Sequence, residues 1–319
     1  MKMEMVNNQN PMRHPKRRLL ELAGGVPYGA GSRLLAYVFG NLLLQRVLFG
    51  RRSRQLHRLR GLIGCSGDTG RDLTRHLLGR YTIPWRVNAL SRFDGPGFRG
   101  WVRIGNEKVI ADMKAADKPI LLVSCHTAIS RLVPLVVTRI GHDIATLEPE
   151  PYLQRMGARG SERIKSITLR GEGEKFWMKE MFQAKKVFDA KGIVHLALDG
   201  HQGTGGIPYA FLGRERLFQV GMARLAIQLG VPIVLTRATL EESGSVSIDF
   251  IGPLDVGDTE LAEDARVMLF LSRYVGMIES VWRDDLGNVS PRHLPHYLNS
   301  EHLPDGAATM ASGRKAEAT

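Results

Sequence analysis

Residues 119–126 decide the fold of this chain: Pro119-Ile-Leu-Leu-Val-Ser-Cys-His126 is a short apolar run that ends on a histidine. A run of this length predicts a buried strand, and residues 127–140 predict the helix that follows it. His126 would then stand at the carboxyl end of a strand, where open α/β sheets place their reactive groups. A helix N-terminus disfavours positive charge, so we expect a neutral imidazole that can accept a proton. The alternative is a histidine that only caps a helix or packs in the core.

A second segment of the same kind favours a functional role. Residues 193–198, Ile-Val-His-Leu-Ala-Leu, run into Asp199 and the glycine-rich residues 200–206. Because the carboxyl ends of neighbouring parallel strands meet at one edge, we predict that His126 and Asp199 share a site. The glycine-rich residues lack the Gly-Lys-Ser/Thr of a Walker loop and the spacing of a dinucleotide fingerprint. They therefore predict no nucleotide cofactor.

Other common catalytic and metal-binding patterns are missing from the sequence. It contains neither a Gly-x-Ser-x-Gly elbow nor a His-Glu-x-x-His pair. Cys65 and Cys125, the only cysteines, lie sixty positions apart, which fits neither a metal motif nor a disulfide framework. We therefore expect no metal, no cofactor and a reducing compartment.

From Trp101 onward, apolar runs alternate with amphipathic stretches, which is the βαβ signature of a mainly parallel sheet covered by helices on both faces. Strands are expected at 101–104, 120–125, near 144–147, near 167–169, and at 193–198, 232–237 and 246–251. Helices are expected at 107–116, 127–140, 175–190, 220–229 and 261–283. We place this α/β domain at residues 93–300. Before it come a disordered basic arm (1–18) and a helical, membrane-associating region (19–92); after it comes a disordered tail (301–319).

The positive charge is concentrated at the N-terminal end. The net charge is +12, and residues 1–60 contain twelve Lys and Arg against two acidic residues. Such an arm predicts an anionic partner, either a membrane surface or a nucleic acid. Residues 34–49 are apolar but shorter than the ~20 residues that span a bilayer. Flanked by arginines, they predict a helix lying in the membrane interface.

One alternative to that interpretation stays open, and another is disfavoured. The apolar face of the same helix would pack equally well on the protein's own core. Nucleic-acid binding is disfavoured because the arginines alternate with an apolar helix rather than with stacking aromatic residues. No secretory signal is evident in the first thirty residues, which lack an uninterrupted apolar core.

Several short motifs, in order along residues 71–283, carry a family resemblance. They are Val102-Arg-Ile-Gly-Asn-Glu107, Lys118 to His126, Val194-His-Leu-Ala-Leu-Asp199, Pro208-Tyr-Ala-Phe-Leu-Gly-Arg214, Val220-Gly-Met-Ala-Arg-Leu-Ala226 with Gly230-Val-Pro-Ile-Val234, and Ile278-Glu279. Together they resemble the lysophospholipid acyltransferase superfamily. The closest branch is that of the bacterial lipid A lauroyl/myristoyl acyltransferases and their phosphatidylinositol-mannoside acyltransferase relatives.

The resemblance implies an acyltransferase at the cytoplasmic face of a bacterial inner membrane. Its donor would be an acyl thioester of acyl carrier protein or coenzyme A, and its acceptor a hydroxyl or amine of a lipid or glycolipid. His126 would be the general base, and Phe211 and Gly213 would belong to a substrate-binding turn. An arginine would bind the acceptor's phosphate, and Arg159, Arg163 and Arg170 are the candidates.

At one position the sequence departs from the family's pattern. The family places an acid five residues after the histidine, and here that residue is Arg131. Either another carboxylate compensates, with Asp199 the first candidate, or catalysis is weakened, or Arg131 binds an anionic group of the substrate. A second function therefore stays open: a weak or inactive homologue that binds lipid or acyl carrier protein.

Overall fold

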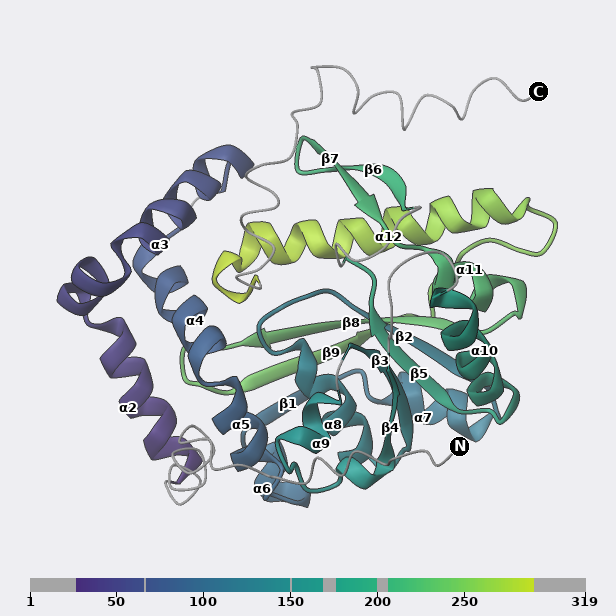
Figure 1. Cartoon of the computed structure of the whole chain (residues 1–319), viewed down its shortest axis with the longest axis horizontal. Helices are drawn as coiled ribbons and strands as arrows, with labels where there is room; N and C mark the ends of the chain where they lie inside the picture. Colours follow the sequence, from purple (N-terminus) through teal and green to yellow (C-terminus); the bar gives the residue numbers. More distant parts are fainter. Residues whose placement is uncertain (1–26, 66, 150, 169–175, 200–205, 290–319) are drawn as a thin grey trace, which may run out of the picture.

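The computed structural model describes residues 27–65, 67–149, 151–168, 176–199 and 206–289 of the chain (Figure 1). The predicted disordered segments 1–18 and 301–319 lie outside these residues, as does Arg170.

A seven-stranded sheet forms the centre of the molecule, in the order β1-β9-β8-β2-β5-β3-β4 (Figure 1). The strands are β1 (Val102–Gly105), β2 (Ile120–Ser124), β3 (Ile144–Glu148), β4 (Ile164–Thr168), β5 (Ile193–Ala197), β8 (Ile233–Leu240) and β9 (Val246–Ile251). Every neighbouring pair is parallel except β8 and β9. Residues 241–245 connect these two strands, and a connection that short permits only an antiparallel hairpin. The predicted mainly parallel sheet is confirmed.

Helices cover both faces of the sheet, as predicted. Along the α/β body they are α6 (Gly95–Arg99), α7 (Lys108–Ala115), α8 (Val133–Arg139), α9 (Tyr152–Arg155), α10 (Phe176–Asp189), α11 (Gly221–Gln228) and α12 (Glu263–Asp284). On one face β2 contributes Leu121 and Val123 to a core shared with α10, α11 and α12. On the other, Ile120 and Leu122 join a core shared with α7 and α8. Alternate residues of one buried strand therefore serve two cores, as expected for a parallel sheet covered on both sides.

The N-terminal helices complete the two cores. They are α2 (Tyr28–Gly40), α3 (Leu42–Ile63), α4 (Thr69–Tyr81) and α5 (Ile83–Leu90). Leu56 and Leu59 of α3 and Leu77 of α4 pack in the core of α12, whereas Tyr28 and Leu78 pack in the opposite core. The predicted helical N-terminal region is confirmed over the described residues, and it shares its hydrophobic cores with the α/β body.

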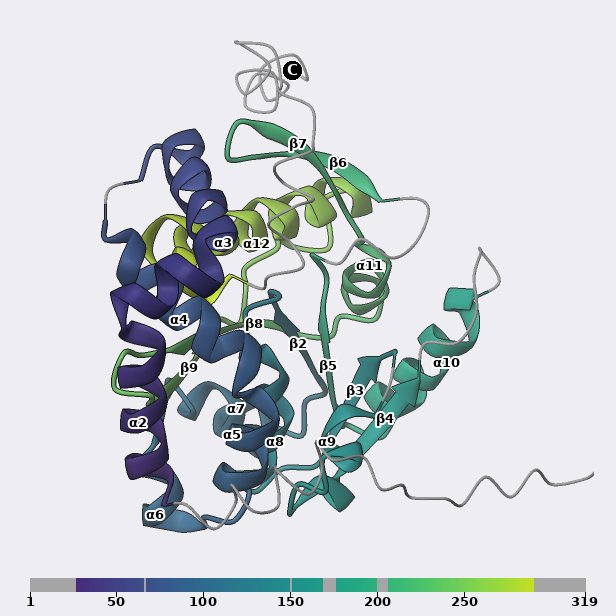
Figure 2. The ribbon, with the colours of Figure 1, turned by 60° about the vertical axis from the view of Figure 1, so that its left-hand side comes forward.

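The apolar residues 34–49 do not form one continuous helix. Asn41 adopts an extended backbone, and its side-chain Oδ1 accepts hydrogen bonds from the N–H groups of Leu43 and Leu44. It therefore ends α2 and caps α3. Along α2 and the first half of α3, large apolar side chains are 40–76% exposed: Leu34, Tyr37, Val38, Leu42, Leu43, Val47 and Leu48. We call these seven residues the α2–α3 patch. The helices α2 and α3, which carry it, lie along one side of the molecule (Figure 2). In the described part of the chain, we find no helix whose length and apolar character would let it cross a membrane.

Two predicted elements have different bounds in the structure, and one further element was not predicted. The helix predicted from Thr127 begins as α8 at Val133, after a 3₁₀ turn at Ser130–Leu132. Pro134 explains the late start, because its ring would clash with the carbonyl four residues earlier in a longer helix. The expected effect of a helix N-terminus on His126 therefore does not apply. The strand predicted near 167–169 runs over 164–168, and a hairpin of β6 (Ile207–Phe211) and β7 (Arg214–Phe218) was not predicted.

Candidate active site

His126 and Asp199 meet at the carboxyl edge of the sheet, as the sequence predicts. β2 and β5 are parallel neighbours, with Ser124 opposite Ala197, and each of the two residues stands two positions after the end of its strand. The His126 Nδ1 lies 2.6 Å from Asp199 Oδ1. The backbone N–H of His126 also donates to Asp199, at 3.0 Å from Oδ1 and 3.1 Å from Oδ2. One carboxylate thus holds both the ring and the main chain of the histidine.

The hydrogen bond to Asp199 fixes the chemistry that the imidazole can perform. An ionised carboxylate only accepts hydrogen bonds, so in neutral His126 the proton is on Nδ1 and the lone pair is on Nε2. The Asp199 side chain is 3% exposed, whereas that of His126 is 38% exposed. A buried carboxylate behind a half-exposed imidazole is the arrangement that orients a general base and stabilises the imidazolium it forms.

Tyr274 and Arg216 support this pair from outside the two strands. The Tyr274 hydroxyl, from α12, donates to the carbonyl of Ser124 at 2.7 Å and accepts the N–H of Leu198 at 3.1 Å. The Arg216 guanidinium, from β7, donates to the backbone carbonyl of Asp199. Sequence reasoning missed both residues. The residues next to them in the sequence do not indicate a role at this site, because α12 and β7 reach it only through tertiary packing.

A row of buried polar side chains crosses the sheet behind the pair. The Ser124 hydroxyl lies 2.7 Å from His195 Nε2 and 2.5 Å from the Thr236 hydroxyl, and Thr146 lies 3.2 Å from His195 Nδ1. These residues come from four adjacent strands, β8, β2, β5 and β3. Burial, and then the positive charge of His126 when protonated, lower the pKa of His195 to about 3, so this histidine stays neutral. The row fixes the end of β2 just before His126.

Arg131 lies on the exposed surface beyond the end of β2. The carbon at the centre of its guanidinium is 4.3 Å from the ring centroid of Tyr152, which is a cation–π contact. Its charge also acts on Glu148, the last residue of β3. The pKa of Glu148 is raised by burial, which outweighs the opposing effects of its Ser166 hydrogen bond, the Tyr152 N–H and Arg131. Arg131 is therefore a cation at the same sheet edge as His126.

The structure does not bring Arg159 and Arg163 to this edge. Arg163 precedes β4, pairs with Asp143 at 2.6 Å and donates to the carbonyls of Thr138 and Gly141. The Arg159 carbonyl accepts from Arg139, at the end of α8. Both arginines therefore lie near the amino ends of β3 and β4, opposite His126. Residues just before a strand always lie at its amino edge, so the predicted sheet already contained this signal. Arg170 lies outside the described residues.

Phe211 and Gly213 belong to the β6–β7 hairpin, where they have structural roles. Phe211 is fully buried and packs edge-to-face on Trp282, with ring centroids 5.1 Å apart. Gly213 has a φ of +75° in the turn, a conformation that favours glycine. Arg216 lies over the Phe211 ring at 5.3 Å. The phenylalanine thus supports the arginine that binds the Asp199 carbonyl.

The described residues contain no cluster of three or more His, Cys, Asp or Glu side chains suited to a metal ion. Comparison with known proteins found no matching family model and no matching curated protein.

Proposed function

We propose that the protein is an acyltransferase that moves a fatty acyl chain from a thioester to a hydroxyl or amine of a lipid or glycolipid. The donor is acyl carrier protein or acyl coenzyme A. The acceptor O–H or N–H attacks the thioester carbonyl while His126 Nε2 takes its proton. The tetrahedral intermediate then expels the thiolate, and His126 Nε2 gives this leaving group the proton that it took from the acceptor. The products are an ester or amide and a free thiol.

The hydrogen-bonded pair of His126 and Asp199 is the observation that carries this proposal. Lipid acyl transfer needs a base beside an accessible acceptor group, and His126 offers a half-exposed imidazole oriented by a buried carboxylate. This carboxylate belongs to Asp199, just after β5, and not to the residue five positions after the histidine. We therefore infer that Asp199 compensates for the absence of an acid at position 131. The sequence motifs that resemble the lipid A acyltransferases support the same reaction.

The α2–α3 patch supports a location on a membrane. Seven large exposed apolar side chains fall on two consecutive helices, and concentrations of this kind mark interaction surfaces. Five exposed arginines accompany it, and residues 27–65 contain no Asp or Glu: the arginines are Arg33, Arg46, Arg51, Arg54 and Arg58. Apolar side chains with flanking arginines suit the interface of an anionic bilayer. We propose docking of α2 and α3 on the cytoplasmic face of a bacterial inner membrane.

A second function is favoured by Arg131. A cation at the sheet edge can bind the phosphate of a lipid or the acidic surface of a carrier protein without any chemistry. The protein would then be a weak or inactive homologue that binds lipid or acyl carrier protein. Acyl transfer distinguishes the two functions, because the second predicts binding without turnover.

The test is acyl transfer by the purified full chain, with acyl carrier protein and coenzyme A thioesters and lipid acceptors extracted from a bacterial membrane. His126→Ala should lower transfer by about 10²–10⁴-fold. The control is His142→Ala, since His142 lies before β3 at the opposite edge of the sheet. Equal turnover in His126→Ala and the native protein rejects the mechanism. No transfer by the native protein from either donor, with retained lipid binding, supports the second function. Mass spectrometry of total lipids from a deletion strain identifies the acceptor.

A further inference from the structure

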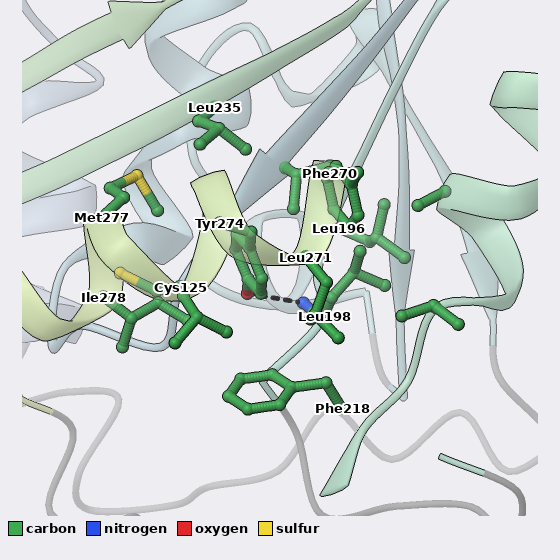
Figure 3. Packing of buried hydrophobic residues seen from close by; sticks show 14 of the residues in the cluster. Cys125, Leu196, Leu198, Phe218, Leu235, Phe270, Leu271, Tyr274, Met277 and Ile278 are labelled. Carbon is green, nitrogen blue, oxygen red and sulfur yellow. Dashed lines mark hydrogen bonds between the residues drawn. The ribbon is translucent and has the colours of Figure 1, made fainter. Parts of the chain in front are cut away.

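Tyr274 occupies an unusual place in the hydrogen-bonding of the sheet. Ser124 and Ala197 form the last register pair of β2 and β5. In a parallel ladder, such a pair is joined through the carbonyl of Ser124 and the N–H of Leu198. The Tyr274 hydroxyl accepts a hydrogen bond from the N–H of Leu198 at 3.1 Å (Figure 3). It donates one to the carbonyl of Ser124 at 2.7 Å. One side-chain hydroxyl therefore bridges β2 and β5 at the last rung of the ladder.

This bridge lies just before the candidate catalytic pair. His126 follows Ser124 by two residues, and Asp199 follows Leu198 by one. The hydroxyl also lies 3.4 Å from Asp199 Oδ1, the atom that accepts the ring Nδ1–H of His126. The hydroxyl that bridges the two strands therefore also lies beside the carboxylate that orients His126.

The ring of Tyr274 is fixed by its surroundings. Tyr274 is fully buried, stacks on Phe270 with centroids 5.7 Å apart, and meets Phe218 of β7 edge-on at 6.3 Å (Figure 3). Burial, and then the charges of Asp199 and Cys125, raise the pKa of Tyr274 well above its ordinary value. The hydroxyl therefore keeps the proton that it donates to Ser124.

We propose that Tyr274 is a positioning residue: its hydroxyl clamps the ends of β2 and β5, and so sets the geometry between His126 and Asp199. Its importance for turnover rests on the proposed acyl transfer, whereas the geometric role does not. Without the hydroxyl, the carbonyl of Ser124 and the N–H of Leu198 lose the group that ties them together. The strand ends then shift, and Asp199 loses its place opposite the imidazole.

The experiment replaces Tyr274 by Phe in the full chain, which removes the hydroxyl and keeps the ring. In the protein labelled with ¹⁵N-histidine, the Nδ1–H of His126 should give a downfield proton resonance, identified by its loss in His126→Ala. In Tyr274→Phe this resonance should move upfield or be lost to exchange with water. In the acyl-transfer assay kcat should fall about 10- to 100-fold, the usual cost of a small misplacement, while KM stays unchanged.

The matched control is Tyr28→Phe. Tyr28 is also buried, and its hydroxyl donates to the Gly244 carbonyl at 2.8 Å, in the other of the two hydrophobic cores from Tyr274. It should leave the His126 resonance in place even where it lowers stability. Equal displacement of the resonance by both variants, or no displacement by Tyr274→Phe, overturns the proposal.

Two further outcomes keep the test decisive. If the native protein transfers no acyl chain, the proposed function fails, while the resonance still tests the geometric role. If Tyr274→Phe does not fold, 3-fluorotyrosine at position 274 serves instead, since fluorine makes the hydroxyl a stronger donor. The His126 resonance should then shift, and an unchanged resonance overturns the proposal.

Discussion

The carboxylate of Asp199 holds His126 at two points, the ring Nδ1 at 2.6 Å and the backbone N–H at 3.0 and 3.1 Å. Both groups are donors, so the site requires a residue that only accepts hydrogen bonds. An acid placed five residues after the histidine could orient the ring alone. Asp199 also fixes the main chain of the residue whose ring it orients.

Asp199→Asn tests that requirement with almost no change in shape. The amide of asparagine brings an N–H₂ donor into a position that faces two donors. The imidazole then favours the tautomer with its proton on Nε2, where it cannot accept one from the substrate. We expect transfer to fall by about 10²–10⁴-fold, close to the loss in His126→Ala. Near-native turnover in Asp199→Asn, measured as initial rates at saturating donor, contradicts the assignment.

Arg131 is tested by two substitutions with different consequences. If its guanidinium binds an anionic group of the acceptor, Arg131→Ala should raise KM more than it lowers kcat, because uniform binding energy is lost. Arg131→Asp should not raise activity, since Asp199 already supplies the carboxylate. A gain of activity in Arg131→Asp would instead identify a decayed enzyme that lacks its acid. Steady-state kinetics with varied acceptor concentration separate these outcomes.

Membrane docking is tested by substitution, since α3 also contributes Leu56 and Leu59 to the core and cannot be deleted without damage. Changing Leu42, Leu43, Val47 and Leu48 to Ser should weaken sedimentation with phosphatidylglycerol vesicles at least about tenfold, because each side chain contributes apolar area. Added salt should weaken binding by the unmodified protein.

The control for that experiment changes exposed apolar residues elsewhere. Met178 and Phe182 of α10 are 76% and 59% exposed, so their replacement by Ser matches the change in surface character. This control should bind vesicles like the unmodified protein. Equal loss in both sets, or binding indifferent to salt and to anionic lipid, counts against docking by α2 and α3.

The buried His195 predicts how stability depends on pH. Burial lowers its pKa from 6.5 to about 3 in the folded protein. Between these values the unfolded chain binds a proton that the folded protein does not, so stability falls as the pH falls through this window. At pH 5 the loss should be about 2 kcal/mol. His195→Gln cannot titrate, so its free energy of unfolding should fall less steeply between pH 6.5 and 4.5.

The same series contains its own control. Near pH 7.5 histidine is neutral in both states, so any difference there reports lost hydrogen bonds rather than titration. His76 is also buried with a pKa lowered to about 3, again mainly by burial, and it should preserve part of the slope in the variant. Identical slopes in the two proteins, from urea unfolding at each pH, would refute the role of His195.

The sequence by itself determined where most strands and helices lie and that His126 and Asp199 share an edge. Burial on two faces makes a strand a continuous apolar run, which is visible locally. Parallel strands point in one direction, so residues that follow them collect at one edge whatever the strand order. Even the late start of α8 was readable, since Pro134 forbids a longer helix.

Only the tertiary structure decided which residues complete the site. It placed β2 beside β5, put Arg131 against Tyr152, and brought Tyr274 of α12 and Arg216 of β7 to the ends of two strands. These contacts join positions far apart in the chain, and they depend on how apolar faces match when the helices pack on the sheet. Periodicity along a sequence records which residues are buried. It does not record which residues they pack against. At this site, packing between distant segments of the chain is what brings His126 and Asp199 together.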